Sequence, residues 1–117
     1  MSYDLDFWQY ETARPMADHH AVYERLSEGE FVAGLRTIPI DAILAKLDGV
    51  FSSLGWTKLD ETNWEGQAGA FQIFTTPQFL RIDCYGMNGE DMNRVIDLAS
   101  GFGLPLYDPQ VGKRYDG

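Results

Sequence analysis

Apolar and polar residues alternate in two runs within Gly69–Gly86, and a short connection around Pro77 joins the runs. Alternation with a period of two predicts β-strands. The side that is mainly apolar consists of Phe71, Ile73, Thr75, Leu80, Ile82 and Cys84. If Thr76 pairs with Phe79, both of these rows lie on one side of an antiparallel hairpin. Because Pro77 cannot adopt the positive φ of the favoured two-residue turns, we expect a slightly longer loop.

A third alternating run covers Tyr3–Tyr10 and predicts a half-buried strand. Its two sides are Tyr3, Leu5 and Phe7 on one, and Asp4, Asp6 and Trp8 on the other. The segment Leu104–Asp108 predicts a short last strand, in which Pro105 takes an edge position or the first position. We expect a turn and a tail over Pro109–Gly117.

Three segments have helical periodicity. The strongest is the stripe Ile40, Ile43, Leu44, Leu47, Phe51 and Leu54, where Pro39 suits the helix start and Gly55 suits the end. Asp18–Glu28 predicts a second helix, and the residues from Asn88 to Gly103 predict a third. The connector Phe31–Ile38 is expected to anchor to the core through Phe31, Val32 and Leu35. Trp56–Glu65 is expected to be a loop.

The predicted order is strand, two helices, two strands, helix, strand. This order is typical of an α+β, ferredoxin-like fold, in which a four-stranded antiparallel sheet carries its helices on one face. The sheet would run in the order 4-1-3-2, with the first and third strands at its centre. A chain of 117 residues is expected to form a single domain over residues 1–117 with one hydrophobic core.

The chain carries 18 acidic residues against nine lysines and arginines, a formal charge of -9. Twelve of these acids precede Gly66. Such a field repels phosphate backbones, so nucleic-acid binding is disfavoured, whereas association with a basic protein is favoured. The simpler alternative is that the acidity only keeps the protein soluble.

Compartment and membrane association can also be predicted. The single cysteine indicates a reducing compartment, the N-terminal residues lack the features of a signal peptide, and no apolar run is long enough to cross a membrane. We therefore expect a cytoplasmic protein.

Residue types that often carry chemistry are present, but their spacing does not favour a catalytic, cofactor or metal site. Adjacent His19 and His20 point about 100° apart on a helix, which suits a solvated helix start better than a metal site. Cys84 alternates with apolar neighbours and is expected to be a buried thiol. Paired acids such as Asp4 with Asp6, or Asp60 with Glu61, lie in polar stretches and are expected to be solvated.

The polar side of the predicted sheet is the first candidate binding surface. It would place Asp4, Asp6 and Trp8 beside Arg81, Asp83 and Tyr85, with Phe74 within cation–π reach of Arg81. Alternatively, the connector or the C-terminal tail folds over this face and buries Trp8. A second candidate patch lies in the predicted loop and consists of Asp60, Glu61, Trp64 and Glu65.

Four segments carry a family resemblance: YDLDFW, RIDCYG, EDMNRVIDLA and PLYDPQVGKRYD. Together they resemble a group of small, acidic, largely uncharacterised bacterial proteins that look like immunity proteins of polymorphic or contact-dependent toxin systems. The resemblance covers most of the chain. It implies a cytoplasmic protein that occludes a toxin, and it supplies no catalytic residues.

The leading hypothesis is therefore a non-enzymatic binding protein whose partner is a basic toxin, plausibly a nuclease. A small-molecule-binding regulatory module of the same topology is the first alternative. An RNA binder that stacks bases on Phe74 and Tyr85 is a further one, which the charge disfavours. Enzymatic activity is the least favoured.

Overall fold

The computed structural model describes residues 2–12, 18–67 and 69–115. At its centre are β4 (Ala70–Thr76) and β5 (Phe79–Tyr85), which pair antiparallel with Thr76 opposite Phe79, as the alternation predicts. The expectation of a longer loop is wrong, because Pro77 and Gln78 alone join the two strands. The buried Gln78 side chain ties this turn to the connector. It accepts a hydrogen bond from the Val32 N–H at 3.0 Å and donates one to the Val32 carbonyl at 2.8 Å.

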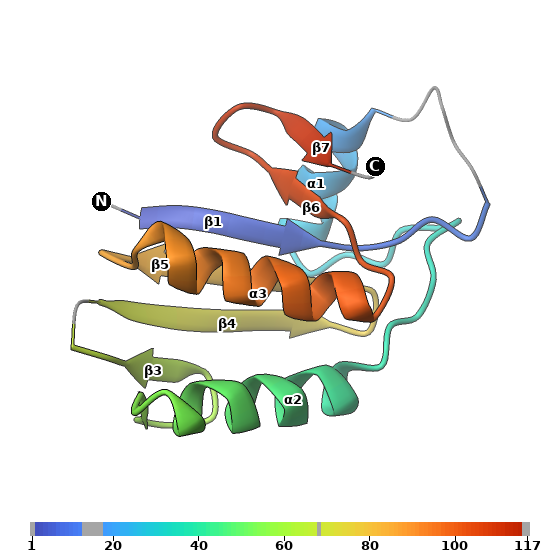
Figure 1. The fold of residues 1–117 in the computed structure, drawn as a ribbon. Coiled ribbons are helices and arrows are strands. Elements are labelled where there is room, and N and C mark those ends of the chain that lie inside the picture. Colours follow the sequence, from blue (N-terminus) through green and yellow to red (C-terminus); the bar gives the residue numbers. More distant parts are fainter. Residues whose placement is uncertain (1, 13–17, 68, 116–117) are drawn as a thin grey trace.

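The sheet is larger than predicted. In the part of the chain that the structure describes, seven antiparallel strands follow the order β2-β3-β4-β5-β1-β6-β7 (Figure 1). The additional strands beside β4 and β5 are β1 (Ser2–Phe7), β2 (Thr57–Lys58), β3 (Asn63–Glu65), β6 (Leu106–Asp108) and β7 (Lys113–Tyr115). The four predicted strands do neighbour each other in the predicted order, but the four-stranded ferredoxin-like sheet is wrong because strands extend it at both edges.

The added strands come from segments predicted to be a loop and a tail. β2 and β3 form a hairpin on the edge of β4, and β7 pairs with β6. These strands have only two or three residues each, too few for an alternation to predict them, and neighbouring strands supply the hydrogen bonds that define them. The last two residues of the predicted tail, 116 and 117, lie outside the described residues.

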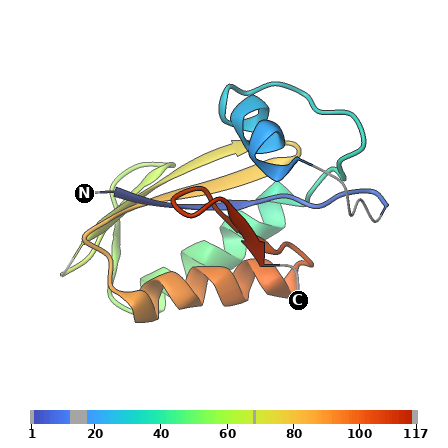
Figure 2. The same cartoon turned by 90° about the horizontal axis from the view of Figure 1, so that it is seen from above.

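The main core lies between one face of the sheet and two helices, α2 (Ile40–Ser53) and α3 (Gly89–Gly101), as Figure 2 shows. The α2 stripe buries Ile43, Leu47 and Phe51, whereas Leu54, just past the helix end, is 42% exposed. The predicted start of α3 is confirmed, because the Asn88 side chain accepts a hydrogen bond from the Asp91 N–H.

The prediction that all helices lie on one face is wrong. α1 (His19–Ser27) lies on the opposite side of the sheet from α2 and α3 (Figure 2). A second apolar cluster fills the space beneath α1 and the connector, and it consists of Trp8, Tyr10, Leu26, Val32, Leu35, Phe79 and Tyr107. Val32 and Leu35 anchor the connector as predicted, but Phe31 is 76% exposed. Both faces of the sheet are therefore covered, at least in part.

Candidate functional site

The polar face of the central strands gathers three aspartates and one arginine. Asp4 lies opposite Asp83, and Asp6 lies opposite Arg81, in the β1–β5 pair. The Arg81 guanidinium lies over the Phe74 ring at 4.8 Å, as the sequence predicts, and its Nε is 3.4 Å from an Asp83 carboxylate oxygen. The predicted neighbours are thus brought together, but the surface that they form is largely covered.

Asp6 is fully buried, so the expectation of a solvated Asp4–Asp6 pair is wrong for this residue. Among the described residues, neither of its carboxyl oxygens has a hydrogen-bond partner. Burial raises the pKa of Asp6 to about 8, and the negative charge of Asp4 adds to that rise while Arg81 opposes it. The folded protein consequently keeps this carboxyl mostly protonated at neutral pH.

Asp83 titrates above its usual range for related reasons. Its pKa is raised to about 6, mainly by burial and in addition by a hydrogen bond with Asp4 and the negative charge of Asp4, whereas Arg81 opposes the rise. The Tyr23 hydroxyl of α1 also reaches Asp4, at 3.5 Å. These interactions join β1, β5 and α1 around carboxyl groups with raised pKa values. Such an arrangement is typical of a structural contact rather than of an open binding surface.

Trp8 is fully buried, which corrects its expected place on a binding surface. Its ring packs against Tyr107 at 5.2 Å between centroids, and the Arg114 guanidinium of β7 lies 5.6 Å from the ring centroid. Arg114 also donates to the Trp8 carbonyl at 2.9 Å. The alternative expectation, that another segment folds over this face and buries Trp8, is therefore confirmed. The C-terminal segment covers the face together with α1. Tyr85, at the far end of β5, remains 43% exposed.

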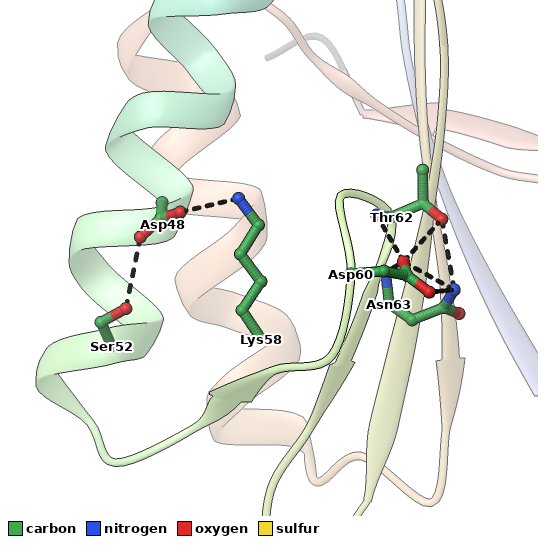
Figure 3. Close-up of polar contacts among 6 residues, drawn as sticks. All are labelled: Asp48, Ser52, Lys58, Asp60, Thr62 and Asn63. Atoms are coloured by element: carbon green, nitrogen blue, oxygen red, sulfur yellow. Dashed lines mark hydrogen bonds and ion pairs between the residues drawn. The ribbon is translucent and has the colours of Figure 1, made fainter.

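The second predicted patch maps to the β2–β3 hairpin. Glu61 and Glu65 are exposed, but Trp64 is buried and stacks on Phe71 with 5.9 Å between centroids. Asp60 is exposed but already engaged: its carboxylate accepts from the N–H groups of Thr62 and Asn63, each at 2.9 Å, and from their side chains (Figure 3). These bonds hold the pKa of Asp60 below its usual range. Asp60 therefore organises the turn, and Glu61 and Glu65 form the free part of the patch.

The histidines of α1 make hydrogen bonds at its start, where His20 is exposed, and the cysteine is buried. The His19 ring nitrogen lies 2.8 Å from the Tyr10 hydroxyl, and the His20 ring nitrogen lies 2.8 Å from the Tyr107 hydroxyl. Cys84 is buried as predicted, and burial raises the pKa of its thiol to about 12. Within the described residues, no cluster of histidine, cysteine and carboxylate side chains has the geometry to hold a metal ion. No helix among them is long and apolar enough to cross a membrane.

A groove that sequence reasoning missed lies between α2 and the edge of β4. It has two hollows, of about 420 Å³ and about 670 Å³, which share Thr75. Its apolar lining includes Ile38, Pro39, Ile40, Ala42, Leu44, Leu47, Trp64, Ile73, Phe74 and Pro77. We call it the α2–β4 groove. It exists because β3 covers only the first half of β4, and a prediction of Trp56–Glu65 as a loop contains no β3 and so cannot show it.

The rim of the α2–β4 groove is acidic. Asp41 and Asp48 of α2 and Glu61 of the β2–β3 hairpin line it, and Lys58 is its basic residue. The Lys58 ammonium is already paired with an Asp48 carboxylate oxygen at 3.0 Å (Figure 3). Three carboxylates against one ammonium leave the rim negative. The groove thus has an apolar floor and a negatively charged rim. It lies next to Glu61 and Glu65, the exposed residues of the second patch.

Comparisons with known proteins identified no relatives. No protein-family model, no curated protein and no solved structure matches this chain. The resemblance to immunity proteins therefore stays a prediction.

Proposed function

We propose that this chain is a cytoplasmic immunity protein that neutralises a cationic toxin by covering its functional surface. The single observation that carries the proposal is the α2–β4 groove, whose apolar lining is bordered by Asp41, Asp48 and Glu61. Apolar centres with a charged rim are the usual anatomy of protein–protein contact sites. The formal charge of -9 supports a basic partner, because opposite charge accelerates association.

The candidate interface differs from the one that the sequence suggested. Asp6, Trp8 and Trp64 are buried, so in this conformation they support the scaffold and do not reach a partner. Glu61 and Glu65 remain available on the β2–β3 hairpin. The proposed interface therefore centres on the α2–β4 groove and this hairpin.

A second candidate is a regulatory module that binds a small molecule. The observation that favours it is the hollow of about 670 Å³ between Ile38–Ala42 and Thr75–Pro77, which lies in the size range of ligand pockets. A small ligand would fill this hollow alone, whereas a protein partner would also contact the acidic rim. Neutralising the rim therefore distinguishes the two candidates.

The experiment is co-expression in a bacterial host with a cationic toxin domain, sought first among the genes that neighbour the gene of this chain. We expect this chain to restore growth and to copurify with that domain. The double variant Asp41→Asn with Glu61→Gln should rescue less well. The control Asp97→Asn removes an exposed acid of α3, outside the groove, and should rescue fully. Absence of both rescue and binding would contradict the proposal.

A further inference from the structure

The edge of β4 is only partly paired. β3 pairs with Ala70–Gln72, and the next contact on that side is the bond from the Ile73 N–H to the Thr62 carbonyl at 2.7 Å. Past the hairpin end, the Ile38 N–H donates to the Pro77 carbonyl at 2.8 Å. Between these two contacts, among the described residues, Phe74–Thr76 has β5 on one side and no strand on the other.

The backbone of Thr75 faces this open side. In an antiparallel pair, successive residues turn their N–H and C=O groups alternately toward and away from the neighbouring strand. The Ile73 N–H points away from β5, toward Thr62. Thr75 lies two residues further along the strand and therefore has the same orientation. Its N–H and C=O are placed to exchange two hydrogen bonds with one residue of an added strand.

The α2–β4 groove fits the side chains of such a strand. A residue directly opposite Thr75 would point to the same face as Thr75, into the groove beside Leu44 and Ile73. Residues two positions away would stand opposite Ile73 and Pro77, where Thr62 and Ile38 already bind, so the added chain pairs over three residues only and leaves the edge on each side. One of these residues would approach Glu61 and Asp48, and the other would approach Asp41. The groove therefore favours an apolar residue flanked at both second neighbours by basic residues.

We propose that an extended, cationic segment of a protein partner adds to β4 as an antiparallel strand beside Phe74–Thr76. Its central apolar residue enters the α2–β4 groove, and lysine or arginine side chains at the second neighbours reach the acidic rim. Backbone bonds to an edge strand supply affinity, and alternate side chains supply specificity, as in other cases of strand addition. The identity of the partner as a basic protein rests on the proposed function.

The test uses a capped synthetic peptide, Lys-Thr-Val-Thr-Lys, titrated to millimolar concentration while the backbone amides are followed by NMR. We expect shifts centred on Phe74–Thr76 and slower hydrogen exchange at the Thr75 N–H. The same peptide with N-methylvaline lacks the donor for the Thr75 carbonyl and should bind roughly tenfold more weakly. A peptide with glutamate in place of lysine should bind less well still. Shifts that are absent from Phe74–Thr76, or unaffected by N-methylation, would overturn the proposal.

Two substitutions of Thr75 test the same hydrogen bonds from the protein side. Thr75→Pro removes the edge N–H without touching the β4–β5 ladder, because proline is tolerated where the N–H points away from the neighbouring strand. Thr75→Ala keeps the N–H and is the matched control. We expect Thr75→Pro to lose peptide binding and Thr75→Ala, which only trims one side chain of the groove lining, to weaken it much less, with both variants folded by circular dichroism. If Thr75→Pro does not fold, the N-methylated peptide decides the matter.

Failure of the inference is distinguishable from failure of the proposed function. If wild type rescues growth and folded Thr75→Pro rescues equally well, strand addition is wrong and the immunity function stands. If wild type does not rescue but the peptide shifts Thr75, the immunity function is wrong and the strand-binding edge stands.

Discussion

Asp6 and Arg81 lie directly opposite each other on β1 and β5, but no ion pair joins them in the described part of the chain. The Arg81 guanidinium is drawn instead toward Phe74 and Asp83. Asp6 is left as a buried carboxyl with a pKa of about 8. A buried acid without a partner is stable only in its protonated form.

The first prediction concerns pH. The folded pKa of Asp6, about 8, lies above its ordinary value of 3.8, and that of Asp83 is raised to about 6. The folded state therefore binds more protons than the unfolded state between about pH 4 and pH 8. The free energy of unfolding should be highest near pH 4 and fall as the pH rises to about 8, by up to about 1.4 kcal/mol per pH unit for one such carboxyl.

Urea denaturation across this range measures the effect. Asp6→Asn keeps a neutral group of the same shape, so its free energy of unfolding should vary less with pH than that of wild type. Asp97→Asn, on the exposed side of α3, should leave the wild-type pH dependence unchanged. A wild-type protein that gains stability steadily from pH 4 to pH 8 would contradict the buried, protonated Asp6.

The second prediction concerns Trp8 and Trp64. Both are buried in apolar clusters, so replacing either one by alanine should cost about 3–5 kcal/mol of unfolding free energy. Tyr85→Ala, at a site that is 43% exposed, should cost less than about 1 kcal/mol. Denaturant melts provide the measurement. Full stability of Trp8→Ala would restore the surface position that the sequence suggested for this tryptophan.

The third prediction separates Asp60 from Glu61. Because the Asp60 carboxylate accepts four donors of the β2–β3 turn, Asp60→Ala should lower the melting temperature and speed hydrogen exchange in β2 and β3. Glu61→Gln should leave both unchanged, since its side chain is exposed and takes no part in these hydrogen bonds. Equal melting temperatures for Asp60→Ala and wild type would show that the turn does not depend on this carboxylate.

The fourth prediction concerns Cys84. Its thiol is buried and its pKa is raised to about 12, so a thiol probe should react slowly with the native protein at neutral pH and quickly in denaturant. Rapid labelling of the native protein would instead indicate that β4 and β5 open readily.

These predictions also mark where sequence reasoning succeeded. The alternation in β4 and β5 fixes their register because a slip by one residue would turn every apolar side chain outward. The apolar stripe of α2 predicts which side of this helix is buried, because its apolar residues recur at helical spacing. Both signals come from long segments whose apolar residues share one face, which is the information that a linear pattern carries best.

The errors have a common physical cause. A period-two pattern placed Trp8 on the polar side of β1, and it does lie there, but α1 and β7 cover that side. The strands β2, β3 and β7 are too short for their own residues to predict them, and pairing with neighbouring strands defines them. The α2–β4 groove then follows from the length mismatch between β3 and β4. Features of this kind depend on contacts between distant segments and could not be read from local periodicity.

The central claim is that a cationic partner is steered to the acidic rim of the α2–β4 groove, and its most direct test is stopped-flow association with the toxin domain of the co-expression experiment. Raising the salt from about 50 to 500 mM shortens the screening length from roughly 14 to 4 Å. The account predicts that the on-rate falls by roughly an order of magnitude while the off-rate changes little, and that Asp41→Asn with Glu61→Gln lowers the on-rate already at low salt. An on-rate indifferent both to salt and to these substitutions would contradict it.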